Sequence, residues 1–153
     1  MRQSHRFPLH GTAPKQLFQN GPVSGVTFTG TQNSYGTYSV NGDKLKCSVT
    51  IAEYDGGSGW AKIVLSTSVP RRNYRKLKYN VTFSREDGDE SDAYIKINGA
   101  SKSISTGEHT VDISGADTIS IELYATARID YQQGGTTVVH ANIDVDHIWL
   151  TRY

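Results

Sequence analysis

Residues 92–127 read DAYIKINGASKSISTGEHTVDISGADTISIELYATA, and this stretch decides the fold. Within it, Asp92–Asn98 and Thr118–Ala127 alternate apolar and polar residues without a break. Such alternation is typical of strands that have one buried and one exposed face. We therefore predict two strong strands with a short Gly-punctuated hairpin between them. Their apolar faces carry isoleucine, leucine and alanine, whereas their polar faces present Tyr94 and Tyr124 among charged residues.

Similar alternation recurs along the chain at the regular spacing expected of a sandwich or barrel. The further strands that it predicts are Val26–Thr29, Thr37–Val40, Lys44–Tyr54, Trp60–Thr67, Lys76–Ser84, Ser101–Ser105, His109–Ile113 and Val138–Arg152. The pair Asn41-Gly42 suits a type I′ turn, because both residues tolerate a positive φ. In the last strand the apolar phase slips, which predicts a β-bulge near Asp146–His147.

The length and composition favour one all-β domain. A chain of 153 residues can bury one hydrophobic core, and its 15 glycines and 9 tyrosines favour strands over helices. Roughly ten strands predict a two-sheet antiparallel β-sandwich, jelly-roll-like in type, over residues 22–153. Residues 1–21, which include Pro8 and Pro14, are expected to form an N-terminal arm or linker. An immunoglobulin-like sandwich is disfavoured because the chain lacks the Cys…Trp…Cys spacing.

The net charge, the apolar segments and the single cysteine limit which partners and cellular routes are expected. A formal net charge of +1 gives no general attraction to nucleic acid or to an anionic membrane, so neither is an expected partner. The chain shows neither an apolar run of membrane-spanning length nor the apolar core of a signal peptide, so export by the standard secretory route is not expected. Cys47 follows the apolar side of its strand and is predicted to be a buried thiol. No cofactor is expected.

The outward-facing aromatic residues carry the most informative chemistry. Sugar rings stack their C–H faces on aromatic planes and need polar partners for their hydroxyl groups. Outward positions of the predicted strands supply both kinds of group, with Asn80 nearby. The candidate carbohydrate-binding residues are Tyr54, Trp60, Lys62, Tyr94, Lys96, Glu122, Tyr124 and Arg128. The alternative is that these aromatic residues occur because strands favour them, and that loops cover the rings.

Charged segments suggest other sites. The basic run Arg71–Lys76, together with Lys78, could contact phosphates, although such runs are more often solvated loops. The acidic turn with Asp87, Asp89, Glu90 and Asp92 has oxygen ligands that calcium accepts, but it lacks the EF-hand spacing. Asp144 and Asp146 on the last strand could also supply oxygen ligands to a metal ion. Whether a metal binds is left open.

No catalytic signature is present. His140 and His147 lie near acidic residues of the last strand, but they alternate faces or fall on either side of the predicted bulge. The chain also lacks the G-x-S-x-G and H-E-x-x-H patterns. A non-enzymatic protein is therefore expected. A glycan hydrolase stays an alternative, because its two carboxylates can be far apart in sequence.

Several segments together resemble a known family. They are QLFQNG (16–21), VPRRNYRKLKYNVTF (69–83), DAYIKINGASKSISTGEHTVDISG (92–115), ISIELYA (119–125) and NIDVDHIWLT (142–151). Over most of residues 17–153 the chain resembles the jelly-roll carbohydrate-binding modules of tail and baseplate proteins from bacteriophages of Gram-positive bacteria. Those modules often carry Gly-Gly-Trp soon after the opening strand, whereas Gly30–Tyr35 has no tryptophan and the similar element here is Gly56–Trp60.

The resemblance implies a virion component at the phage tail, in contact with the host-cell surface. Its implied partners are cell-surface polysaccharide and other virion tail proteins, and a homo-oligomer such as a trimer is implied as well. The leading hypothesis is thus a carbohydrate-binding module. A second hypothesis is a purely structural virion protein, docked through its N-terminal arm, that binds no sugar.

Overall fold

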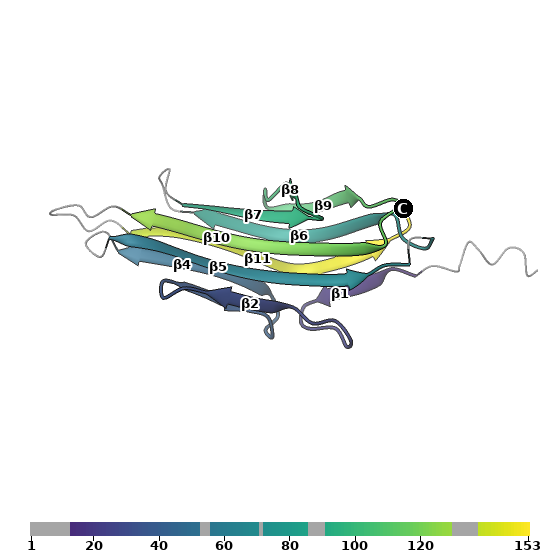
Figure 1. Cartoon of the computed structure of the whole chain (residues 1–153), viewed down its shortest axis with the longest axis horizontal. Coiled ribbons are helices and arrows are strands. Elements are labelled where there is room, and N and C mark those ends of the chain that lie inside the picture. The colour runs from purple at the N-terminus through teal and green to yellow at the C-terminus, as the bar shows by residue number, and fades with distance from the viewer. Residues whose placement is uncertain (1–12, 53–55, 71, 86–90, 130–137) are drawn as a thin grey trace, which may run out of the picture.

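The computed structural model describes residues 13–52, 56–70, 72–85, 91–129 and 138–153, which are coloured in Figure 1. Eleven β-strands and no helix lie within these ranges. The strands are β1 (Lys15–Gln19), β2 (Thr29–Gln32), β3 (Gly36–Ser39), β4 (Leu45–Ala52), β5 (Gly57–Ser68), β6 (Lys76–Arg85), β7 (Ser91–Ile97), β8 (Ala100–Lys102), β9 (Gly107–Asp112), β10 (Thr118–Ile129) and β11 (Val138–Thr151). No helix of the described ranges is long and apolar enough to cross a membrane.

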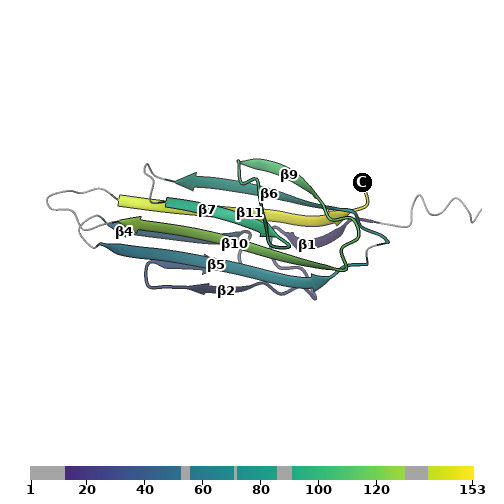
Figure 2. The same cartoon turned by 45° about the horizontal axis from the view of Figure 1, so that its top comes forward.

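The strands form two antiparallel sheets that pack face to face. Sheet A has the order β3-β4-β11-β6-β9, and β1 pairs with the second half of β11 beside β4. Sheet B has the order β2-β5-β10-β7-β8. Figures 1 and 2 show them as two layers, with β5 and β10 running over β4 and β11. The predicted two-sheet antiparallel sandwich is confirmed.

The strand order is that of a jelly roll. The eight strands from β4 to β11 pair in nested fashion, β4 with β11, β5 with β10, β6 with β9 and β7 with β8. This nesting places four of them in each sheet, as in the jelly-roll arrangement of two Greek keys. The predicted hairpin between Asp92–Asn98 and Thr118–Ala127 is wrong, although the two segments do pair as β7 and β10. The chain between them first adds β8 to sheet B and then crosses to form β9 of sheet A.

The sandwich starts earlier in the chain than the sequence pattern suggests. Residues 15–19, expected in the N-terminal arm, form β1, in which Leu17 and Phe18 are both fully buried. An irregularity in the pairing with β11 between Gln16 and Phe18 lets two successive side chains enter the core. In addition, β2 begins at Thr29 rather than Val26, and β5 begins at Gly57 rather than Trp60.

The β-bulge predicted in the last strand is confirmed. The pairing of β11 with β6 shifts register between Val145 and His147, so Asp146 is the extra residue. Val145 and Ile148 on either side of the shift are both buried, while Asp146 and His147 are half-buried. The bulge thus keeps the apolar side chains of both halves of β11 in the same core.

Cys47 is fully buried, as predicted, and its thiol lies 3.8 Å from the carbonyl oxygen of Leu123 in the opposite sheet. Burial, and secondarily the negative charge of Asp144, raises the pKa of this thiol from 9.0 to about 12. The native protein therefore keeps the thiol protonated at a pH at which the unfolded chain has lost that proton.

This difference predicts a loss of stability at high pH. Above pH 9 the unfolded state binds fewer protons than the native state, so the free energy of unfolding falls as pH rises towards 12. Between pH 9 and pH 10 the thiol should contribute a decrease of about 1 kcal/mol that Cys47→Ala lacks. Urea unfolding of both proteins at pH 7, 9 and 10 measures this. Parallel pH profiles of the two proteins would contradict it.

Candidate functional site

Three of the predicted aromatic residues gather on the outer face of sheet B. Tyr124 of β10 lies directly opposite Tyr94 of β7 on one side and Lys62 of β5 on the other. Trp60 of β5 lies opposite Thr126, two residues further along β10. The alternation of each strand turns these side chains away from the buried isoleucine, leucine and alanine residues between them. All three aromatic residues are half-buried, so part of each ring is open to solvent.

The rings of this face form one row. The rings of Tyr94 and Tyr124 are parallel within 19° with centroids 4.8 Å apart, and Tyr124 and Trp60 are parallel within 16° at 6.5 Å. Nearly parallel rings 4.8 Å apart overlap, so Tyr94 and Tyr124 each cover one face of the other. Among the described rings Trp60 stands at one end of this row, and it is half-buried. Its indole is the candidate stacking surface of the row.

Charged side chains hold the other end of the row. The Tyr94 hydroxyl donates a hydrogen bond of 2.5 Å to Glu122, and the ammonium nitrogen of Lys96 lies 4.6 Å from the centre of the Tyr94 ring. Glu122 and Lys96 lie directly opposite each other in the register of β10 and β7. Burial, and then the hydrogen bond to Glu122, raises the pKa of Tyr94 well above its usual value. The hydrogen bond to Glu122 and the Lys96 ammonium group over the ring together position the Tyr94 side chain.

Trp60 is positioned by the turn between β2 and β3. The side-chain oxygen of Asn33 accepts a hydrogen bond of 3.0 Å from the backbone N–H of Trp60. The backbone N–H of Asn33 donates to the Trp60 carbonyl at 3.2 Å. The Asn33 side-chain NH₂ group also donates to the carbonyl of Ser58 at 2.9 Å. Next to Trp60, Gly59 allows β5 to pack closely on β4, since an added Cβ would lie only 2.5 Å from Val49 Cγ1. The backbone that carries the indole is therefore fixed by polar contacts and tight packing.

The remaining predicted site residues fall into three groups. Lys62 and Arg128 lie on the outer face of sheet B, Lys62 half-buried and Arg128 exposed. Tyr54 lies outside the described residues. Asn80 belongs to sheet A, where its side-chain NH₂ group donates to Asp146 at 2.9 Å, so it is not part of the row. The sheet B face therefore carries Trp60, Lys62, Tyr94, Lys96, Glu122, Tyr124 and Arg128; we call it the ring face.

The charged segments singled out in the sequence are only partly covered by the described residues. Arg71, Asp87, Asp89 and Glu90 lie outside the described residues, and Asp92 is exposed and accepts from the next amide. His147 contacts Gln16 at 2.6 Å. Within the ranges that the structure describes, no three His, Cys, Asp or Glu side chains are grouped so that they could hold a metal ion.

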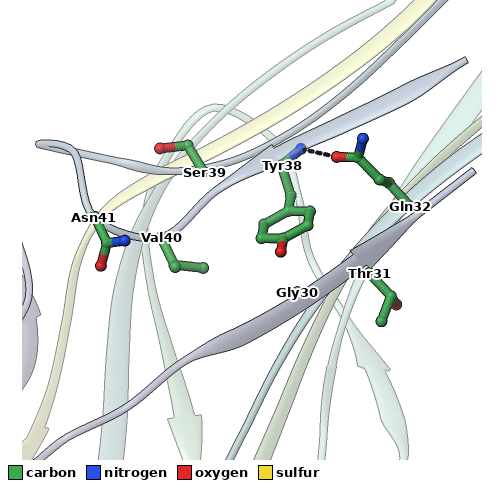
Figure 3. Close-up of a pocket in the computed structure, with 7 residues that line it drawn as sticks. All are labelled: Gly30, Thr31, Gln32, Tyr38, Ser39, Val40 and Asn41. Carbon is green, nitrogen blue, oxygen red and sulfur yellow. Dashed lines mark hydrogen bonds between the residues drawn. The ribbon is translucent and has the colours of Figure 1, made fainter. Parts of the chain in front are cut away.

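Two features were missed by sequence reasoning. On the outer face of sheet A, Trp149 stacks on His147 with ring centroids 3.7 Å apart. The alternation of β11 was a usable signal for this outward tryptophan. A groove between β2 and β3, shown in Figure 3, is lined by residues of both strands and contains the exposed Tyr38. No local signal marks the groove, since its two strands belong to different sheets.

The fold and the ring face define a jelly-roll sandwich with an aromatic surface. No protein-family model and no curated protein matches the chain. The chain is similar to part of the secreted serine protease VesC from Vibrio cholerae, with 18% identity, a TM-score of 0.45 and coverage of 87% of this chain. It spans 25% of the VesC chain. It is also similar to the low-affinity xylan-binding module CBM86 from Roseburia intestinalis, with 14% identity, a TM-score of 0.30 and coverage of 79% of this chain and 96% of that module.

Proposed function

We propose that this protein is a non-enzymatic carbohydrate-binding module that binds saccharide on the ring face of sheet B. The observation that carries this proposal is the row formed by Tyr94, Tyr124 and Trp60 across three neighbouring strands. An exposed aromatic surface on a stable β-sandwich suits the C–H faces of a sugar ring. The Trp60 indole at the end of the row is the stacking position, with the Tyr124 ring stacked beside it.

The polar groups of the ring face suit the hydroxyl groups of a saccharide. Lys62 and Arg128 supply donors near Trp60, and Glu122 supplies an acceptor at the other end of the row. The rings are already stacked in the free protein, so binding loses little side-chain entropy. The proposed ligand is a polysaccharide, of which one sugar unit stacks on Trp60.

The proposed biological setting is the tail or baseplate of a bacteriophage that infects Gram-positive bacteria, with the module attaching the virion to host cell-surface polysaccharide. This setting is supported by the sequence resemblance described above, which also favours contacts with other virion tail proteins and a trimer. Sedimentation of the purified protein tests the trimer directly. A monomer at all concentrations would argue against it.

The proposal predicts that Trp60→Ala weakens binding to bacterial polysaccharide at least about tenfold, since it removes the stacking surface. Tyr124→Ala should weaken binding as well, because Trp60 loses the ring beside it. The measurement is co-sedimentation with cell walls from a panel of Gram-positive bacteria, followed by calorimetry with the polysaccharide released from walls that bind. Trp149→Ala is the matched control, because it removes a tryptophan from the opposite outer face.

The outcomes separate the candidate functions. Binding that ignores both Trp60→Ala and Tyr124→Ala would overturn the ring face as the site. A protein that binds no wall but assembles with tail proteins would instead be the purely structural component. Release of reducing sugar from wall polysaccharide would identify a glycan hydrolase and contradict the non-enzymatic proposal.

A further inference from the structure

A groove of about 700 Å³ runs along the edge of the sandwich between β2 and β3. These two strands are edge strands of different sheets, β2 of sheet B and β3 of sheet A. A hydrogen bond of 3.1 Å from the Tyr38 amide to the side-chain oxygen of Gln32 links them. The volume lies within the range of small-ligand sites. None of its lining residues is among those of the ring face, although Thr31 lies directly opposite Lys62 of that face.

The Tyr38 ring forms an aromatic surface within this groove. Figure 3 shows the ring directed from β3 towards Gly30 on β2. A Cβ added at Gly30 would lie 2.2 to 2.6 Å from three carbons of the ring, so the ring rests on the glycine backbone. Even so, 38% of Tyr38 is exposed. The ring therefore has one face supported by the protein and surface left open to a ligand.

The seven described residues that line the groove carry no charge. Thr31 and Ser39 carry hydroxyl groups, and Gln32 and Asn41 carry amides. The Gln32 amide is held through its oxygen, so its NH₂ end is the part that can donate to a ligand. Figure 3 shows the side chains of Thr31 and Ser39 turned away from the Tyr38 ring, so Gln32 and Asn41 are the remaining polar side chains of the lining. Uncharged amides beside an open aromatic ring match an uncharged sugar. A phosphate or a uronic acid would find no cation among these residues.

From these observations we infer that the β2–β3 groove is a second saccharide-binding site, specific for an uncharged sugar unit that stacks on Tyr38. The inference does not depend on the ring face, because the rings of Trp60, Tyr94 and Tyr124 do not line the groove. Together the two sites would let one copy of the module hold two sugar units of a polysaccharide, or two chains of it.

The test is an NMR titration of the ¹⁵N-labelled protein with uncharged tetrasaccharides of glucose, galactose, mannose, rhamnose and xylose. At least one of them should shift the amide signals of Gly30, Tyr38 and Asn41. Tyr38→Ala should weaken that binding at least about tenfold, because it removes the stacking ring. Gly30→Ala should weaken it comparably, since the new methyl group displaces the ring. The matched control is Gly42→Ala, where the nearest atom, Ser39 Oγ, is 3.5 Å away and binding should be unchanged.

The same titration separates this site from the ring face. The double variant Trp60→Ala, Tyr124→Ala should keep the shifts at Gly30 and Tyr38, and their loss in a folded double variant would overturn a separate site. Absence of groove shifts with all five tetrasaccharides, or equal binding by Tyr38→Ala, would overturn the inference as well. Tetragalacturonate should leave the groove signals unshifted. Binding there as strong as that of the uncharged sugars would contradict the specificity.

Discussion

Replacing Gly36 with alanine is expected to lower the free energy of unfolding by about 3 kcal/mol. Gly36 is a buried residue of β3, and a Cβ at this position would lie 1.9 Å from the carbonyl oxygen of Trp60 and 2.5 Å from its carbonyl carbon. Both atoms belong to the backbone of β5, so no side-chain rotation relieves the overlap. Because β3 and β5 lie in different sheets, the methyl group would force the sheets apart at this edge.

Urea unfolding of Gly36→Ala, followed by circular dichroism, measures this loss of stability. Gly42→Ala is a control in the same part of the chain and should change the free energy of unfolding by no more than about 0.5 kcal/mol. Equal stabilities of the two variants would contradict the close packing of β3 on β5. A folded Gly36→Ala protein should also bind polysaccharide more weakly, because the displaced backbone is the one that carries Trp60.

Replacing Phe18 with alanine is expected to lower the free energy of unfolding by about 3 to 5 kcal/mol. Phe18 is fully buried, and its ring packs edge to face with that of Phe28, with centroids 6.1 Å apart. Truncation therefore removes a large apolar surface and leaves a cavity that the flanking strands cannot easily close. The same unfolding experiment measures the effect.

The neighbouring residue provides the control for Phe18→Ala. Gln19 belongs to the same strand but is exposed, so Gln19→Ala should change stability by about 0.5 kcal/mol or less. If Phe18→Ala were as mild as Gln19→Ala, β1 would not be part of the cooperatively folded sandwich. A large difference would make the segment from Lys15 onward integral to the domain.

The fold was predictable because most of the strands carry their own signal. Alternation in segments such as Lys76–Ser84 and Thr118–Ala127 requires no knowledge of neighbouring strands, and the slip in β11 marked its bulge. For β1 this signal failed. Leu17 and Phe18 are adjacent and both buried, which breaks the alternation, and only the irregular pairing with β11 explains it.

The site was predictable only in part, because binding surfaces depend on which strands are neighbours. The sequence places Tyr94 and Tyr124 on outward positions, but their contact follows from the pairing of β7 with β10. Similarly, Trp60 and Trp149 both point outward, yet they lie on opposite outer faces of the sandwich. The groove at Tyr38 depends on the meeting of two edge strands from different sheets, which no local pattern encodes.

The position of β11 has a consequence for how the protein is made. This strand, Val138–Thr151, lies in the middle of sheet A and pairs with β1, β4 and β6. During synthesis, β1, which begins at Lys15, therefore gains its partner only after the ribosome has released residues near 150. Pairings across such long sequence separations slow folding, typically to milliseconds or seconds. Until then, the apolar side chains of the earlier strands stay exposed, and that interval is when the new chain is most open to aggregation and to chaperones.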